Sequence, residues 1–139
     1  LGSGWSSYVL RLHQKLVDPA LDVWSVDDNE EWLGTTARFL ARHDLGTSNL
    51  GLWPRIGDAP FDLVFYDMGR PWERHQHLDR VLDATAGVLI CDDVQFEDYR
   101  GRRDAFARAR GHRLELVRDE TLDAFGRFSG RMTRRGYFS

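Results

Sequence analysis

Acidic side chains follow several apolar segments of this sequence, at the points where strands are expected to end. They are Asp27 and Asp28 after residues 21–26, Asp58 after 50–56, Asp67 after 61–66, and Asp92 and Asp93 after 87–91. Ligands of open α/β sheets bind beyond the carboxyl ends of the strands, so these carboxylates are candidates for a ligand site. The alternative for each of them is an ordinary helix cap or turn residue.

A glycine-containing turn, Gly2-Ser3-Gly4, precedes an expected helix over residues 5–17. Such a turn lets a ligand approach the backbone, and the helix amino end favours a carboxylate or a phosphate. Ser7 stands where the third glycine of the dinucleotide fingerprint would be, so that fingerprint is incomplete. Asp27, at the end of the next expected strand, could accept hydrogen bonds from both ribose hydroxyls of a nucleoside. Its alternative role is to cap the following helix.

Helical and strand-like patterns alternate along the chain. Helices are expected over 5–17, 30–43, 72–83 and 99–110, and strands over 21–26, 50–56, 61–66, 87–91, 112–118 and 125–133. This order predicts an α/β fold with a mostly parallel sheet and helices on both faces. The last two segments are joined by residues 119–124, too few for a crossover helix, and should form a carboxyl-terminal antiparallel hairpin.

Composition limits the class of protein. A chain of 139 residues with 42% hydrophobic residues suits one domain, residues 1–139, with a single core. The net charge of −3 argues against a broad basic surface and hence against nucleic acid as a partner, and it leaves open only a local basic patch. No apolar run approaches the roughly 20 residues of a membrane helix. Cys91 is the only cysteine, which fits a cytoplasmic protein. The oligomeric state is not encoded in any pattern that we recognise.

The series GSG, VWSVDD, GDA, FDLVFYD and GVLICDD resembles the ordered motifs of class I S-adenosylmethionine-dependent methyltransferases, over residues 1–133. The resemblance implies a Rossmann-like fold with S-adenosylmethionine as cofactor. It also implies cofactor-binding residues: Gly2, Ser3 and Gly4 under the methionine part, Asp27 and Asp28 near the ribose, Asp58 and Ala59 beside the adenine, and Asp67. The family's central first strand would precede Gly2, so we expect this strand to be largely missing and the domain to be incomplete at its amino terminus.

A narrower resemblance is to the metal-dependent catechol-type O-methyltransferases, where aspartates at the ends of the fourth and fifth strands hold magnesium. By that resemblance Asp67, Asp92 and Asp93 would be the metal ligands, and Arg70 occupies the family's basic position. Arginine is effectively always protonated and cannot act as a base. His75 is therefore a candidate base beside Asp67, and His77 is a weaker one. Alternatively, no metal binds and the carboxylates only cap a loop.

The function expected from these residues is methyl transfer to an oxygen, or else a nitrogen, of a small-molecule or saccharide acceptor. Asp67, Arg70 and His75 are the expected catalytic residues. The alternative is a non-catalytic Rossmann-like module that binds ligands or serves as a scaffold in a larger protein. The family's usual helix between the third and fourth strands is also missing, because only residues 57–60 join them.

Overall fold

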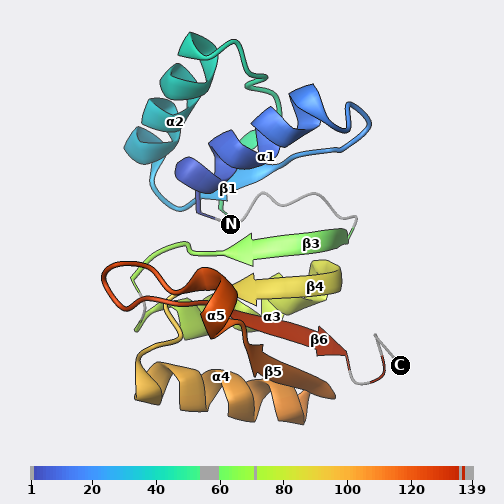
Figure 1. Ribbon diagram of the computed structural model, residues 1–139, viewed down its shortest axis with the longest axis vertical. Helices are drawn as coiled ribbons and strands as arrows, with labels where there is room; N and C mark the ends of the chain where they lie inside the picture. Colours follow the sequence, from blue (N-terminus) through green and yellow to red (C-terminus); the bar gives the residue numbers. More distant parts are fainter. Residues whose placement is uncertain (1, 54–59, 71, 135, 137–139) are drawn as a thin grey trace. The chain divides into compact units, whose positions relative to one another are not determined.

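The computed structural model describes residues 2–53, 60–70, 72–134 and 136. The chain divides into two compact units, Leu1–Gly57 (unit 1) and Asp58–Ser139 (unit 2), each with its own sheet (Figure 1). That residues 1–139 act as one domain therefore remains a prediction. Among the described residues, no helix is long and apolar enough to span a membrane.

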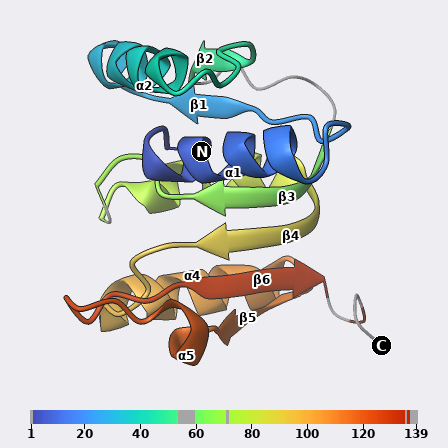
Figure 2. The same cartoon turned by 45° about the horizontal axis from the view of Figure 1, so that its top comes forward.

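Unit 1 has a two-stranded parallel sheet and two helices (Figure 2). Its elements are α1 (Trp5–Leu16), β1 (Ser25–Asp27), α2 (Glu30–Arg42) and β2 (Leu50–Leu52). β1 and β2 pair in register, with Ser25 opposite Leu50 and Asp27 opposite Leu52. The expected strand 21–26 thus starts later and extends by one residue, which places Asp27 inside the strand.

Local sequence explains where α2 begins. The Asn29 side chain accepts a hydrogen bond from the Trp32 amide at 2.9 Å, and Glu30 and Glu31 follow in the first turn. Both features stabilise a helix amino end, because they satisfy a free N–H and oppose the helix dipole. Arg11 of α1 donates to the carbonyl oxygens of Gly46 and Ser48 at 2.8 and 2.7 Å, which fastens α1 to the loop after α2.

Unit 2 has a four-stranded sheet with the strand order β3-β4-β6-β5. Its elements are β3 (Phe61–Tyr66), the 3-10 helix η1 (Arg74–His77), α3 (Leu78–Asp83), β4 (Thr85–Cys91), α4 (Glu97–Ala109), β5 (His112–Leu116), α5 (Arg118–Thr121) and β6 (Gly130–Arg134). β3 and β4 are parallel, whereas β6 is antiparallel to both β4 and β5. The predicted carboxyl-terminal antiparallel hairpin is confirmed.

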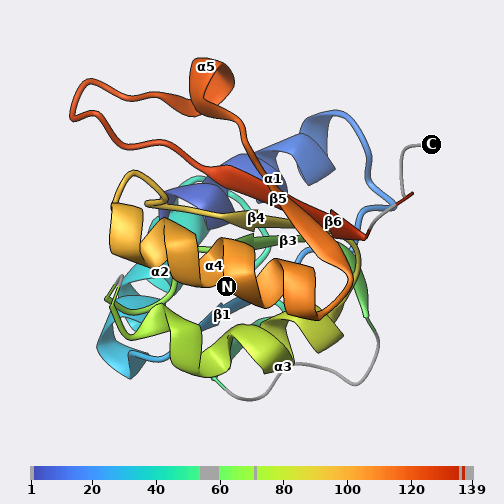
Figure 3. The same ribbon diagram turned by 90° about the horizontal axis from the view of Figure 1, so that it is seen from below.

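The strand directions gather functional groups at one edge of unit 2. β3, β4 and β5 run the same way, so their carboxyl ends and the loop that leads into β6 share that edge. α3 and α4 lie on the same face of the sheet (Figure 3). The sheet contributes buried side chains to the core, among them Val64, Tyr66, Leu89, Cys91 and Met132. Burial raises the pKa of the Cys91 thiol to about 11.

Several expected boundaries differ from the structure. The helix expected over 72–83 begins as a 3-10 turn at Arg74, and the last strand begins at Gly130 rather than at residue 125. Residues before Gly130 form a turn instead, because Asp123 accepts hydrogen bonds from the Phe125 and Arg127 amides and Gly126 has φ of 77°. For the strand expected over 50–56, residues 50–52 form β2, and 54–56 lie outside the described residues.

Candidate active site

The glycine turn and Asp27 meet in unit 1. Both the amide and the hydroxyl of Ser3 donate to Asp27 Oδ2, at 2.6 and 2.8 Å, and the Gly2 amide donates to the Val26 carbonyl at 2.8 Å. Gly2 and Gly4 have φ of 98° and 128°, which side chains rarely allow. The turn thus depends on its glycines and is tied to the end of β1.

Asp27 is a buried carboxylate with few acceptor positions left. It is 5% exposed, and its Oδ1 accepts a hydrogen bond from the Asn29 amide at 3.0 Å. A carboxylate offers about four lone-pair positions, of which these three hydrogen bonds use three. Asp27 could therefore accept one ribose hydroxyl as it stands, and a second if the Ser3 hydroxyl turned away. Asp28 is exposed at the same strand end, whereas Asp58 and Ala59 lie outside the described residues.

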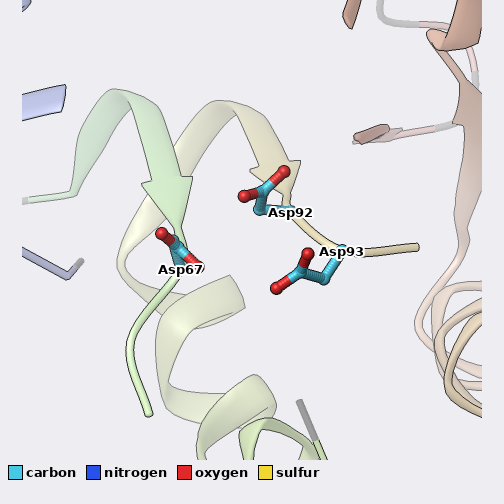
Figure 4. A group of neighbouring side chains, drawn as sticks. All are labelled: Asp67, Asp92 and Asp93. Carbon is cyan, nitrogen blue, oxygen red and sulfur yellow. The ribbon is translucent and has the colours of Figure 1, made fainter. Parts of the chain in front are cut away.

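Three carboxylates come together in unit 2: Asp67 after β3, and Asp92 and Asp93 after β4 (Figure 4). One oxygen from each lies within 4.8 Å of the others. Asp92 Oδ1 accepts a hydrogen bond from the Ser129 hydroxyl at 2.8 Å, and Asp93 has φ of 58°. Two unit charges at 4.8 Å repel by about 3 kcal/mol at an effective dielectric of about 20, so this acidic cluster needs a compensating charge.

Arg74 supplies that charge. Its guanidinium lies 2.6 Å from Asp67 Oδ1 and 3.2 Å from Asp93 Oδ2, and the side chain is only 4% exposed. It also donates to the Gly69 carbonyl from Nε at 3.2 Å and from Nη2 at 3.1 Å. The Tyr66 hydroxyl in turn donates to the Arg74 carbonyl at 2.8 Å, so both the backbone and the side chain of Arg74 are fixed.

The arginine changes the acid–base properties of the cluster. Partial burial raises the pKa of the Asp67 carboxyl, and the charges of Asp92 and Asp93 raise it further, whereas Arg74 opposes the shift. Burial on its own lowers the pKa of Arg74, but Asp67, Tyr99 and Asp93 together outweigh it and the net shift is upward. Asp67 is 43% exposed at its side chain, so it is the member of the cluster that solvent and an acceptor can best reach.

A second buried arginine lies deeper in unit 2. Arg103 of α4 is fully buried, with its guanidinium 5.2 Å from the Tyr66 ring centroid and 4.4 Å from that of Tyr99. Its Nη2 donates to the Tyr99 hydroxyl, whereas its Nε and Nη1 have no hydrogen-bond partner among the described residues. Arg103 is therefore a buried cation, whereas Arg102 and Arg108 of the same helix are exposed.

The cluster fits magnesium poorly. Its oxygens gather as a metal site requires, but the Arg74 guanidinium already occupies the space between Asp67 and Asp93. A divalent ion about 4 Å from that fixed cation would be repelled by about 8 kcal/mol at an effective dielectric of about 20. The sequence prediction of magnesium at Asp67, Asp92 and Asp93 is thus not supported, because it left out a buried arginine.

The other expected catalytic residues lie on the surface. Arg70 is exposed, with its guanidinium 5.7 Å from the ring centroid of Trp72. His75 is exposed in η1, and its Nδ1 lies 2.9 Å from the Trp72 carbonyl oxygen. His77 is half-buried. The contact of the His75 ring is to the Trp72 carbonyl rather than to Asp67, so Asp67 is the better candidate of the two for accepting a proton.

Helical spacing could have revealed both buried arginines. Arg74, Leu78 and Val81 recur at the interval that places side chains on one helix face, and the last two belong to the core. Tyr99, Arg103 and Ala107 show the same pattern in α4, and all three are buried. An arginine in phase with core residues is a signal of a buried cation that a search for carboxylates and histidines overlooks.

Neither a protein-family model nor a curated protein sequence matches this chain. Several solved structures do match. An rRNA methylase from Streptococcus thermophilus has a TM-score of 0.57 and 16% identity, covering 81% of this chain and 73% of its own. A Clostridium thermocellum protein described as an rRNA-methylase has a TM-score of 0.57 and 12% identity, covering 80% and 71%. M. jannaschii TYW2, solved in complex with AdoMet, has a TM-score of 0.50 and 14% identity, covering 81% and 57%.

The fold is that of class I S-adenosylmethionine-dependent methyltransferases. The Rossmann-like fold class expected from the motif order is thereby confirmed. One expectation about partners is wrong. The net charge argued against nucleic acid, yet two of the proteins with this methyltransferase fold are rRNA methylases by name. Net charge averages over the whole surface and does not describe the few residues around a site, so it could not support that exclusion.

Proposed function

We propose that this protein transfers the methyl group of S-adenosylmethionine to RNA. The observation that carries the proposal is Asp67, a reachable carboxylate with a raised pKa at the carboxyl end of β3, in a methyltransferase fold. Proteins of this fold include rRNA methylases and one solved with AdoMet, which supports both the cofactor and the class of acceptor.

Residues of unit 1 would hold the cofactor. Gly2, Ser3 and Gly4 form a turn without bulky side chains before α1, and Gly4, which has no side chain, leaves the amino end of that helix without a side-chain cap. The positive end of the helix dipole favours the carboxylate of the methionine part. Asp27, with Asp28 beside it, would accept the ribose hydroxyls. Bound there, S-adenosylmethionine would supply an electrophilic methyl group on a sulfonium.

Asp67 would accept the acceptor's proton. Its Oδ1 is held by Arg74, and we assign its other oxygen to the acceptor. We propose an oxygen acceptor ahead of a nitrogen, because a hydroxyl must lose its proton to become a good nucleophile, whereas a neutral amine is already nucleophilic. The sugar-like oxygen expected from the sequence would then be a hydroxyl of RNA itself, with Asp67 as its general base.

Exposed aromatic rings in the loops around the same edge of unit 2 favour RNA. Trp72, which follows β3, is 64% exposed, and Phe125, which precedes β6, is 82% exposed. Each ring has an arginine beside it: Arg70 for Trp72, and Arg127 at 5.2 Å for Phe125. Unpaired bases stack on exposed aromatic side chains and on guanidinium planes. Two such pairs could hold a single-stranded segment.

The test is methyl transfer with radiolabelled S-adenosylmethionine, using the full chain and total rRNA as acceptor. We expect label in RNA that ribonuclease releases, and far less label in RNA incubated with an Asp67→Asn variant. Label transferred only to small hydroxylated molecules would contradict the RNA acceptor but retain the methyltransferase. No label in any acceptor, together with normal cofactor binding, would favour a non-catalytic module instead.

Asp27→Ala should weaken binding of S-adenosylhomocysteine by about 1–3 kcal/mol, because ribose hydroxyls lose a charged acceptor. Isothermal titration calorimetry measures this directly. Asp44→Asn is the control, because it removes the charge of another carboxylate of unit 1, one that is 97% exposed and pairs with Lys15. Its affinity should stay close to that of the wild type. Equal affinities for the Asp27 variant and the wild type would remove Asp27 from the cofactor site.

A further inference from the structure

The position of Arg74 in the acidic cluster suggests how the negative charge of the three carboxylates is compensated. Three carboxylates within 4.8 Å are the arrangement that a divalent cation stabilises in proteins. Here the space between two of them holds a guanidinium that contacts both, at 2.6 and 3.2 Å. We infer that the Arg74 guanidinium takes the place of a divalent metal ion as the cation that joins Asp67 and Asp93, next to Asp92.

Burial and hydrogen bonding make Arg74 a fixed part of the site rather than a mobile surface charge. Its side chain is 4% exposed, and the Gly69 carbonyl accepts from both its Nε and its Nη2. Moving it aside for a metal would break these bonds and bury a cation without partners. A guanidinium also offers a planar set of donors to carboxylates, which a spherical ion does not.

The replacement has a geometric consequence for Asp67. Its Oδ1 is held by Arg74 Nη2, so one oxygen is engaged, and the 43% exposed side chain keeps access to solvent. Arg74 is thus a positioning residue that acts through Asp67, and it also holds Asp93 on its other side. Any activity at this site should then be independent of magnesium.

The test measures metal binding rather than methyl transfer, so its result does not depend on the proposed function. Full-length wild type, Arg74→Met and Arg74→Lys are titrated with Mn²⁺ and followed by electron paramagnetic resonance, and their melting is recorded with and without millimolar Mg²⁺. Methionine keeps an unbranched apolar stem but no charge, so it leaves the carboxylates uncompensated. Lysine keeps a cation and is the matched control.

We expect no saturable Mn²⁺ site in the wild type or in Arg74→Lys, and a new site in Arg74→Met that disappears when Asp93→Asn is added. Mg²⁺ should raise the melting temperature of Arg74→Met by about 3–5 °C and leave the wild type unchanged. If Arg74→Met fails to fold, the Mn²⁺ titration of the wild type still tests whether Arg74 takes the place of a metal ion. A wild-type Mn²⁺ site that Asp93→Asn removes would overturn the inference, and so would a folded Arg74→Met that binds no metal.

Discussion

Arg74→Met should lower the free energy of unfolding by about 2–4 kcal/mol at neutral pH. Removing one partner of a buried ion pair costs about 3–5 kcal/mol, because it leaves a buried charge without compensation. Asp67 is 43% exposed and Asp93 15%, so water screens part of that loss and the lower range applies. Chemical denaturation of the full chain measures the difference.

Arg103→Met is the control for this loss of stability. Arg103 is as deeply buried as Arg74 but has no carboxylate partner among the described residues, and two of its nitrogens have no hydrogen-bond partner there. Removing it leaves no carboxylate uncompensated, so the loss should be clearly smaller than for Arg74→Met. Equal losses for the two variants would show that Arg74 stabilises the fold by packing rather than by charge.

The pH dependence of stability also distinguishes stabilisation by the charge of Arg74 from stabilisation by its packing. Arg74 is the group that opposes the upward pKa shift of Asp67, so this pKa should rise further in Arg74→Met. A carboxyl whose pKa is higher in the folded than in the unfolded state binds more protons when folded, and stability then increases as the pH falls. The loss of stability of Arg74→Met relative to the wild type should therefore be greatest at neutral pH. It should become smaller as the pH falls towards the unfolded-state pKa of aspartate, about 3.9. A deficit that is constant with pH would contradict the electrostatic role.

Asp67→Asn should lower kcat/KM for methyl transfer by about 10²–10⁴, the usual contribution of a general base. Asparagine keeps the shape of the side chain and can still accept a hydrogen bond from Arg74, but it cannot take up the acceptor's proton. The matched control is Asp62→Asn, which removes an exposed carboxylate near the opposite end of β3. Activity of the Asp62 variant should remain near that of the wild type.

The wild-type rate should also fall as the pH falls through the raised pKa of Asp67, because only the ionised carboxylate can accept a proton. Asp67→Asn should retain a low rate without this limb of the pH profile. Wild-type activity for Asp67→Asn, or an unchanged acidic limb in that variant, would remove Asp67 from the reaction and leave it as a structural partner of Arg74.

The sequence predicted the fold well where patterns were long. The apolar runs of β3 and β4 and the Asn29 cap of α2 are local signals, and the structure has those elements near the expected positions. Short elements were less predictable. β1 and β2 have three residues each, and their bounds depend on pairing with each other rather than on local propensity. The turn before β6 depends on Asp123, which accepts hydrogen bonds from amides two and four residues later, and the alternation of apolar and polar residues over 125–133 did not indicate this turn.

The sequence predicted the carboxylates of the candidate site but not their counter-charge. Strand-end aspartates follow from the fold, and the structure does bring Asp67, Asp92 and Asp93 together. What the sequence could not specify was the counter-charge, because it comes from a different element, η1, and from a residue type that usually lies at the surface. The expectation of magnesium came from the resemblance to the metal-dependent O-methyltransferases and did not consider Arg74.

The distribution of Cys91 and the tryptophans makes the two units separately observable. Cys91 is the only cysteine and lies buried in unit 2, whereas four of the five tryptophans, Trp5, Trp24, Trp32 and Trp53, belong to unit 1. Reaction of the thiol with a disulfide reagent therefore reports the opening of unit 2, and indole fluorescence reports mainly unit 1. Coincident transitions of the two native reporters would identify one cooperative domain, and separate transitions would identify two independently folding halves.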